Sequence, residues 1–317
     1  MLKIVVIGYG QMFANLILGA IESGHNVVGA FRHDKVIFPP AYLAIKDIIS
    51  PSPDKSFLNS YNIRKINATS VNSDKFKKEI LKLNPDIILV GSWSEKLKQQ
   101  IINLPKIACI NCHPSLLPKY RGPNPYAQTI IHGETKTGIT FHLMDTKFDT
   151  GAILLQKEVE ILPTDTGESL KNRCANTAKQ EIGILLNKLD NEIIIPIPQN
   201  ETLASYQPQL CEKDIILDFN KSAREIDQKI RGLSPWMKCY IPHGNQFFRV
   251  SDYKIIDNKS EFNTPATITM AKKRTIQITT LDHKIIEFYN LKLFGTHLNF
   301  ITEMYTRFKI KPGDKIT

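Results

Sequence analysis

Residues 3–31 read KIVVIGYGQMFANLILGAIESGHNVVGAF and decide the fold class of the chain. The apolar run at 3–8 predicts a buried strand, and residues 11–23 carry apolar side chains at helical spacing before Gly24 ends the helix. A second apolar run at 26–31 predicts the next strand. A strand, a helix and a strand in this order are typical of a parallel sheet with crossover helices, so we expect an α/β domain.

The same alternation continues as far as residue 112. The expected elements are a helix at 71–84, a strand at 86–91, a helix at 94–102 and a strand at 107–112. Ser73 is placed to cap the first of these helices. Residues 113–123 are rich in Pro and Gly and follow the last strand. Open α/β sheets bind ligands at this position, past the carboxyl end of a strand.

The rest of the chain changes character after a Pro-containing stretch at 191–208. Before it, we expect helices at 124–132 and 167–188 and strands at 138–144 and 152–160. After it come a helix at 222–231 and short β-runs broken by turns, which favour a small barrel or sandwich. We therefore expect an α/β domain at 1–190, a linker at 191–208 and a small β domain at 209–317.

The composition is that of an ordinary globular protein. The chain has 317 residues, is 42% hydrophobic and carries five cysteines without framework spacing. It is too apolar for a disordered chain and has no collagen-like repeat. The apolar start is too short for a signal peptide, and no stretch of about 20 residues lacks charge. We expect a cytoplasmic protein that does not span a membrane, with reduced thiols.

Positive charge is in excess and unevenly distributed. The 41 Lys and Arg against 31 Asp and Glu give a net charge of +10. From residue 201 onward, 18 Lys and Arg against 13 Asp and Glu leave +5 on 117 residues, so the C-terminal third is the more densely basic part. A nucleic acid or another anionic partner of this part is a hypothesis that the charge supports.

A glycine pair after the first strand invites comparison with dinucleotide-binding proteins. Gly8 and Gly10 stand between a strand and a helix, as the dinucleotide fingerprint requires. Phe13 replaces the third glycine, and Arg32 and His33 stand where an NAD site needs an acid. We interpret the glycines as a tight turn from strand to helix.

Cys109 and Cys112 precede His113 with the spacing of a haem-attachment motif. Haem attachment of this type needs export, for which no signal is present. The two cysteines also lie along an expected strand, where they point in opposite directions rather than forming a redox pair. They are interpreted as buried structural residues.

The same strand carries residues suited to acyl transfer. Asn111 and His113 are two apart on an extended chain, so both project from one face. Asp149 lies in a loop that ends at Gly151. A carboxylate that reaches His113 would fix its tautomer and stabilise its charged form, and the Asn111 amide could donate to a developing oxyanion. Such a trio can catalyse acyl transfer without a protein nucleophile.

The segment that contains these residues resembles the folate-dependent formyltransferase family. Residues 111–125 read NCHPSLLPKYRGPNP, and matching residues follow at 133–134, 137–140, 144–145 and 149–151. The resemblance implies a Rossmann-like formyltransferase domain, 10-formyltetrahydrofolate as the formyl donor and a primary amine as the acceptor. No cluster has metal-ligand spacing, so no metal is expected.

The resemblance also implies roles for particular residues. The catalytic Asn, His and Asp of the family fall on Asn111, His113 and Asp149. Asn111 and protonated His113 would stabilise the tetrahedral oxyanion, while Asp149 would hold His113 and help to relay the proton that the amine loses. The residues expected at the folate site are Ser115, Leu116, Leu117 and Pro118 of the Ser-Leu-Leu-Pro loop, with Val90, Gly91, Thr140 and Gly151.

The C-terminal region bears on the amine acceptor. Residues 215–219, 222–223, 230–231, 234–236 and 311–314 resemble the OB-type domain of the tRNA-formylating branch of the family. This branch formylates the methionyl amino group of initiator Met-tRNA, so an OB-like barrel that holds the acceptor arm is expected at 209–317. A barrel that only supports the first domain is the alternative. A one-domain glycinamide ribonucleotide enzyme is excluded by length.

Two features favour a different acceptor, a nucleotide-linked amino sugar. Residues 32–60 are rich in Pro and apolar side chains, where tRNA enzymes carry a basic, glycine-containing insertion. Residues 119–125, KYRGPNP, are closer to the sugar enzymes than to the Trp-Arg-Gly-Ala-Ala-Pro form of the tRNA enzymes. Both acceptors therefore stay open, with a non-enzymatic folate- or nucleic-acid-binding protein as a third hypothesis.

Overall fold

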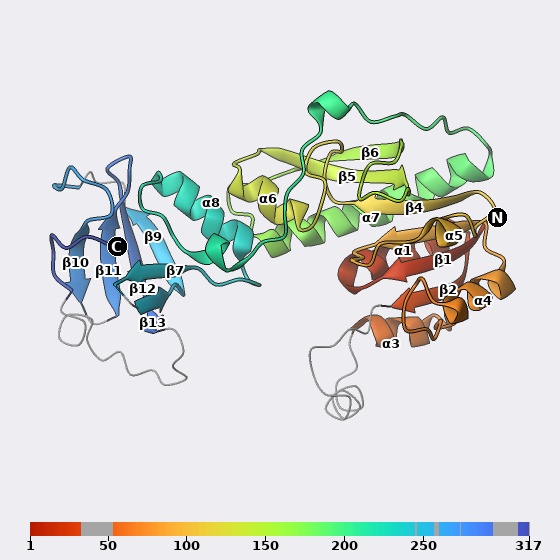
Figure 1. Ribbon diagram of the computed structural model, residues 1–317, viewed down its shortest axis with the longest axis horizontal. Coiled ribbons are helices and arrows are strands. Elements are labelled where there is room, and N and C mark those ends of the chain that lie inside the picture. The colour runs from red at the N-terminus through yellow and green to blue at the C-terminus, as the bar shows by residue number, and fades with distance from the viewer. Residues whose placement is uncertain (33–52, 245, 257–259, 273, 294–309, 317) are drawn as a thin grey trace. The chain divides into compact units, whose positions relative to one another are not determined.

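The computed structural model describes residues 1–32, 53–244, 246–256, 260–272, 274–293 and 310–316 (Figure 1). Within this part the chain forms two compact units. Unit 1 takes in residues 1–126, 136–161 and 169–208, and unit 2 takes in residues 127–135, 162–168 and 209–317. The expected linker at 191–208 therefore belongs to unit 1, and the expected domain boundaries stay predictions. His33 and most of the segment 32–60 lie outside the described residues.

Unit 1 is built on a six-stranded sheet in the order β2-β1-β3-β4-β5-β6. The strands are β1 (Lys3–Gly8), β2 (Asn26–Arg32), β3 (Ile87–Gly91), β4 (Ala108–His113), β5 (Lys136–Leu143) and β6 (Ile153–Glu160). The first four are parallel, which confirms the α/β prediction, whereas β5 runs antiparallel to both β4 and β6. The sheet is thus mixed. An antiparallel pair needs only a short connection, and the loop from β5 to β6 supplies it.

The helices of unit 1 follow the predicted order with two differences. They are α1 (Gly10–Glu22), α3 (Pro53–Ser60), α4 (Asp74–Leu83), α5 (Gln99–Ile102), α6 (Pro125–Ile131) and α7 (Gly167–Asp190), of which α6 and α7 extend into unit 2. Helix α3 was not predicted. Of the helix expected at 94–102, only the last turn forms. The Asn72 amide donates to the Lys96 carbonyl and accepts from the Lys98 N–H, which holds this backbone out of a helix.

Helix α4 packs on one face of the sheet. Ser73 caps it as predicted, because its side chain accepts a hydrogen bond from the Phe76 N–H at 3.2 Å. Phe76 and Ile80 are fully buried in one cluster with Val5 and Val90 of the neighbouring strands. This cluster fixes the end of β3 beside the candidate site.

Helices α1 and α7 approach each other closely at Gly19. A Cβ atom at Gly19 would lie 2.4 Å from the Lys179 carbonyl oxygen and 2.3 Å from the Ile182 side chain. Helix α1 also contacts Gly91 through Leu16, whereas the adjacent Val90 faces the α4 cluster. Successive residues of a strand point to opposite faces, so α1 and α4 cover opposite faces of the sheet.

Unit 2 contains helix α8 (Ala223–Leu233) and two antiparallel sheets. The strands are β7 (Tyr240–His243), β8 (Gln246–Arg249), β9 (Asp252–Ile256), β10 (Ile268–Lys272), β11 (Thr275–Thr279), β12 (Ile285–Tyr289) and β13 (Lys292–Leu293). They form sheets in the orders β10-β11-β12-β9 and β13-β8-β7. Residues of both sheets share one buried cluster with Ile226 and Leu233 of α8. Short antiparallel strands around one core agree with the expected small barrel-like domain.

Helix α8 begins where the sequence indicates. The Ser222 side chain accepts from the Glu225 N–H, and the Glu225 carboxylate accepts from the Ser222 N–H in return. This reciprocal capping box satisfies two backbone donors at the helix start. Among the described residues, no helix is long and apolar enough to cross a membrane.

Substitution of Gly19 tests the contact between α1 and α7. Helix propensity alone favours Gly→Ala by about 0.5–1 kcal/mol. The added methyl group would meet the Lys179 carbonyl, so Gly19→Ala is expected to lower the free energy of unfolding by about 1–3 kcal/mol instead. Urea unfolding measures the change. Lys188→Ala, at an exposed position of α7, should stay within about 0.5 kcal/mol of the parent protein. A stabilised Gly19→Ala variant would show that the helices are not in close contact.

Candidate active site

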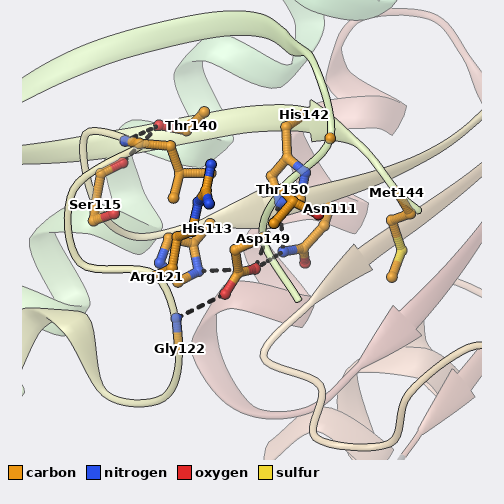
Figure 2. A network of polar contacts seen from close by, with 12 residues as sticks. Asn111, His113, Ser115, Arg121, Gly122, Thr140, His142, Met144, Asp149 and Thr150 are labelled. Atoms are coloured by element: carbon orange, nitrogen blue, oxygen red, sulfur yellow. Dashed lines mark hydrogen bonds and ion pairs between the residues drawn. The ribbon is translucent and has the colours of Figure 1, made fainter. Parts of the chain in front are cut away.

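Asn111 and His113, two residues apart on β4, meet Asp149, which is distant in sequence, at the carboxyl end of this strand (Figure 2). Asn111 and His113 project from β4, and Asp149 lies in the loop between β5 and β6. The Asn111 amide nitrogen lies 3.3 Å from Asp149 Oδ1, and His113 Nδ1 lies 3.4 Å from the same oxygen. The predicted trio is therefore one connected polar network.

The Asp149 carboxylate is nearly buried and is held by several donors. Its side chain is 10% exposed, and Oδ2 accepts the Gly122 N–H at 2.9 Å. Burial acts to raise the pKa of Asp149, but the positive charge that His113 carries when it is protonated and the hydrogen bond from the Gly122 N–H act in the opposite direction and outweigh it. The pKa of Asp149 is therefore held well below its ordinary value of 3.8. The group is a carboxylate at neutral pH.

His113 is buried, with 5% of its surface exposed, and both ring nitrogens have partners. Nε2 lies 2.9 Å from the Tyr120 carbonyl oxygen, which can only accept, so Nε2 carries a proton. In the neutral ring, Nδ1 is then unprotonated and faces Asp149. Burial lowers the pKa of His113 below its ordinary value of 6.5, against the opposing effects of the Asp149 carboxylate and the Tyr120 carbonyl. Protonation of Nδ1 creates a buried ion pair with Asp149.

His142 belongs to the same network, although the sequence did not single it out. It lies opposite Asn111 in the β4–β5 register. Its Nδ1 lies 2.8 Å from the Leu143 carbonyl oxygen, so in the neutral ring Nε2 is an acceptor. The Asn111 amide nitrogen donates to this Nε2 at 3.1 Å. Thr140, which was expected at the folate site, and His142 are two residues apart on an expected strand. This spacing could have indicated that both side chains project from the same face.

The contacts of Asn111 refine what this amide can do. Its two N–H groups are directed to His142 Nε2 and Asp149 Oδ1. An amide nitrogen has only two hydrogens. Donation to a developing oxyanion therefore requires that one of these hydrogen bonds be exchanged when a substrate binds.

The Ser-Leu-Leu-Pro loop is tied to β5 and β6 through Thr140 and Gln156. Thr140 Oγ1 donates to the Ser115 carbonyl at 2.6 Å and accepts from the Leu117 N–H at 3.2 Å. Gln156 Nε2 donates to Thr140 Oγ1 at 2.9 Å and to the Leu117 carbonyl at 2.7 Å. The peptide bond between Leu117 and Pro118 is cis. Five of the residues expected at the folate site, Ser115, Leu116, Leu117, Pro118 and Thr140, are thus gathered in one place.

The other residues expected at the folate site, Val90, Gly91 and Gly151, lie near the trio and can offer only their backbone to a ligand. Val90 and Gly91 end β3, and Val90 lies beside Asn111 in the parallel register. The Val90 side chain is buried in the α4 cluster, so only its backbone could touch a ligand. At Gly151, a Cβ atom would lie 1.8 Å from the Leu143 carbonyl oxygen, so only glycine fits. This close approach sets the path of the loop that carries Asp149.

Comparison with known proteins identifies the family. Residues 2–185 match the Formyl transferase family, and residues 209–303 match the Formyl transferase, C-terminal domain family. The chain belongs to the formyl transferase family. It is 29% identical to the methionyl-tRNA formyltransferase of Desulforamulus reducens over 98% of this chain and 96% of that protein. It is 32% identical to the enzyme of the same name from Alkaliphilus oremlandii over 93% of this chain and 94% of that protein.

A solved structure shares the fold of this formyl transferase. It is the N-formyltransferase from Helicobacter canadensis in complex with folinic acid and dTDP-3-aminofucose. The TM-score is 0.67 at 18% sequence identity, and the match covers 91% of this chain and 99% of that one. At this identity the likeness concerns the fold. Within the described residues, no group of three or more His, Cys, Asp or Glu could hold a metal ion.

The protonation of His113 should appear in the pH dependence of stability. Because the pKa of His113 is lower in the folded protein, the unfolded chain binds more protons between that pKa and about 6.5. The free energy of unfolding should therefore fall as pH falls through this range. Replacement by Gln, which does not titrate, should remove that part of the slope. Urea unfolding at several pH values between about 5 and 7.5 measures it. An identical slope in His113→Gln would contradict the assigned direction.

Proposed function

We propose that this protein transfers the formyl group of 10-formyltetrahydrofolate to the methionyl amino group of Met-tRNA. The observation that carries the proposal is the contact of Asn111, His113 and Asp149 at the end of β4. Family membership supports formyl transfer as the reaction. Relatives named methionyl-tRNA formyltransferase, similar over nearly the whole chain, support Met-tRNA as the acceptor.

In the proposed reaction, the amine nitrogen attacks the formyl carbon and a tetrahedral oxyanion forms. The Asn111 amide donates to this oxyanion after exchanging one of its present hydrogen bonds, and the positive charge of protonated His113 stabilises it. Asp149 helps to relay the proton that the amine loses, directly or through a water molecule, to the folate nitrogen. The bond from the formyl carbon to that nitrogen then breaks, and tetrahydrofolate leaves with the relayed proton. The low pKa of Asp149 keeps the carboxylate available to hold His113.

The loop at 115–118 is proposed to bind the folate. Thr140 and Gln156 anchor its backbone, so that it is preorganised next to His113. The backbone of Val90 and Gly91 borders the other side of Asn111. Preorganisation of this kind lowers the ordering cost of binding and places the formyl carbon near the trio.

The C-terminal unit is proposed to contact the acceptor arm of the tRNA. Its match to the C-terminal family domain and its excess of positive charge support this role. The amino-sugar alternative has two observations of its own, the KYRGPNP sequence at 119–125 and the Pro-rich, apolar composition of residues 32–60. Cytoplasmic location also stays a prediction.

Removal of either titratable residue of the trio should abolish most of the activity. Loss of one charge-stabilising group commonly costs about 10²–10³ in rate. His113→Ala and Asp149→Asn are each expected to lower kcat for Met-tRNA formylation by that factor while keeping the circular dichroism spectrum of the parent protein. Glu158→Gln removes an exposed carboxylate of β6 and should leave kcat unchanged. Turnover near the parent rate in either trio variant would contradict the proposed chemistry.

Salt dependence separates the two acceptors. Binding of Met-tRNA through several phosphates should weaken steeply, and linearly on a double logarithmic plot, as salt is raised. Fluorescence anisotropy with labelled Met-tRNA between about 50 and 200 mM salt measures the slope. A compact nucleotide-linked amino sugar has few phosphates and should show little salt dependence. Tight binding of the amino-sugar nucleotide with no measurable tRNA binding would favour the alternative acceptor.

A further inference from the structure

The segment at 197–207, which the sequence assigned to a linker, is hydrogen-bonded to two loops of the candidate site. It runs parallel to the chain at Arg121, where the Arg121 N–H donates to the Ser205 carbonyl at 2.9 Å. The Gln207 N–H donates to the Arg121 carbonyl at 2.8 Å. At its other end, Ile197 pairs antiparallel with Ile153 at the start of β6. The segment is part of unit 1 and joins the loop before Gly122 to the loop of Asp149.

Gln199 is the side chain of this segment that touches the Asp149 loop. Its Nε2 donates to the Asp149 carbonyl at 2.9 Å and to the Gly151 carbonyl at 2.7 Å. Its Oε1 accepts from Arg121 Nη2 at 2.8 Å and from Arg121 Nε at 3.2 Å. Both amide hydrogens and the amide oxygen are therefore used, which fixes the orientation of the side chain.

Arg121 completes the connection from the other side. It is buried, with 7% of its surface exposed, and its guanidinium donates to both carboxylate oxygens of Glu201 at 2.7 and 2.9 Å. A bidentate contact of this kind is among the more strongly oriented interactions in proteins. Arg121 immediately precedes Gly122, whose N–H binds the Asp149 carboxylate. Arg121 and Gln199 therefore connect Gly122, which donates this hydrogen bond, to the backbone of Asp149, whose carboxylate accepts it.

The backbone of Asp149 needs such support. Its φ is +58°, in the left-handed region, which Asp adopts where local hydrogen bonds support it. Gln199 donates to the carbonyl of Asp149 itself and to the carbonyl of Gly151, two residues later. The same segment also holds the partner of His113, because Ser205 Oγ accepts the Tyr120 N–H at 2.9 Å. Both members of the His113–Asp149 pair therefore depend on contacts with the segment 197–207.

We propose that Gln199 is a positioning residue, which with Arg121 holds the Asp149 backbone so that the carboxylate faces His113. The role in turnover rests on the proposed formyl transfer, whereas the structural role does not. Loss of the Gln199 amide frees the two carbonyls and lets the loop change its path. The carboxylate then moves relative to His113 Nδ1. A displacement of about 1 Å at a catalytic group can cost up to about 10²-fold in rate.

The test replaces Gln199 with Met, which keeps the length of the side chain but has no amide hydrogens. Gln199→Met is expected to lower kcat for Met-tRNA formylation by about tenfold to a hundredfold. The KM for 10-formyltetrahydrofolate should stay within about twofold, because the loop at 115–118 is anchored separately by Thr140 and Gln156. Leu203→Ala, at an exposed position of the same segment, is the control and should match the parent protein.

A second measurement does not depend on activity. The titration of His113 is followed by NMR in protein labelled at histidine, assigned with His113→Gln. The groups that influence this ring are Asp149, the Tyr120 carbonyl and His142. A displaced Asp149 stabilises the imidazolium less, so the midpoint should move to lower pH in Gln199→Met, in the same direction as in Asp149→Asn.

The two readouts separate the positioning role from the proposed reaction. A folded Gln199→Met variant with the parent kcat and an unchanged His113 midpoint would overturn the inference. Should the parent protein fail to formylate Met-tRNA, a shifted midpoint would still support the positioning role. Should Gln199→Met fail to fold, Gln199→Glu takes its place in the kinetic test, because a carboxylate keeps the contact with Arg121 but cannot donate to the two carbonyls.

Discussion

The buried carboxylate of Asp149 is the group on which the arrangement of the candidate site depends. A charge removed from water costs several kcal/mol unless nearby groups compensate it. Here the compensation comes from the Gly122 N–H of the next loop, the Asn111 amide and, when it is protonated, His113 on β4. Asn111 and His113 belong to β4, Gly122 to the loop that follows it and Asp149 to the loop between β5 and β6. Each segment must therefore be in place before the carboxylate can be buried, so the chemistry of the site and the fold of unit 1 are coupled.

The mixed sheet is what brings these segments together. The parallel strands β1 to β4 place Asn111 and His113 at the carboxyl edge, where open α/β sheets bind ligands. The antiparallel pairing of β5 with β4 sets His142 opposite Asn111 and Thr140 opposite His113. One strand pair thus supplies both the network around Asp149 and the anchor of the loop at 115–118.

Much of this could be predicted from the sequence, and two of the failures share a cause. The strands follow from runs of apolar residues, and the pair Asn111 and His113 follows from the two-residue repeat of a strand. Of the helix expected at 94–102, the part at 94–98 is absent because Asn72, distant in sequence, binds that backbone. Gln199 was not singled out, because it lies in a Pro-rich stretch whose composition predicts a linker. Both of these residues act through contacts with residues far apart in sequence, which local patterns do not encode.

The most direct test of the account is to identify the formylated product. Purified protein is incubated with 10-formyltetrahydrofolate and either Met-tRNA or a nucleotide-linked 4-amino sugar, and the products are analysed by mass spectrometry. We expect a formyl group on the methionyl amine of Met-tRNA and no formylated sugar. Formylation of the amino sugar with Met-tRNA unchanged would contradict the proposed acceptor, and no formylated product from either amine would contradict the reaction itself.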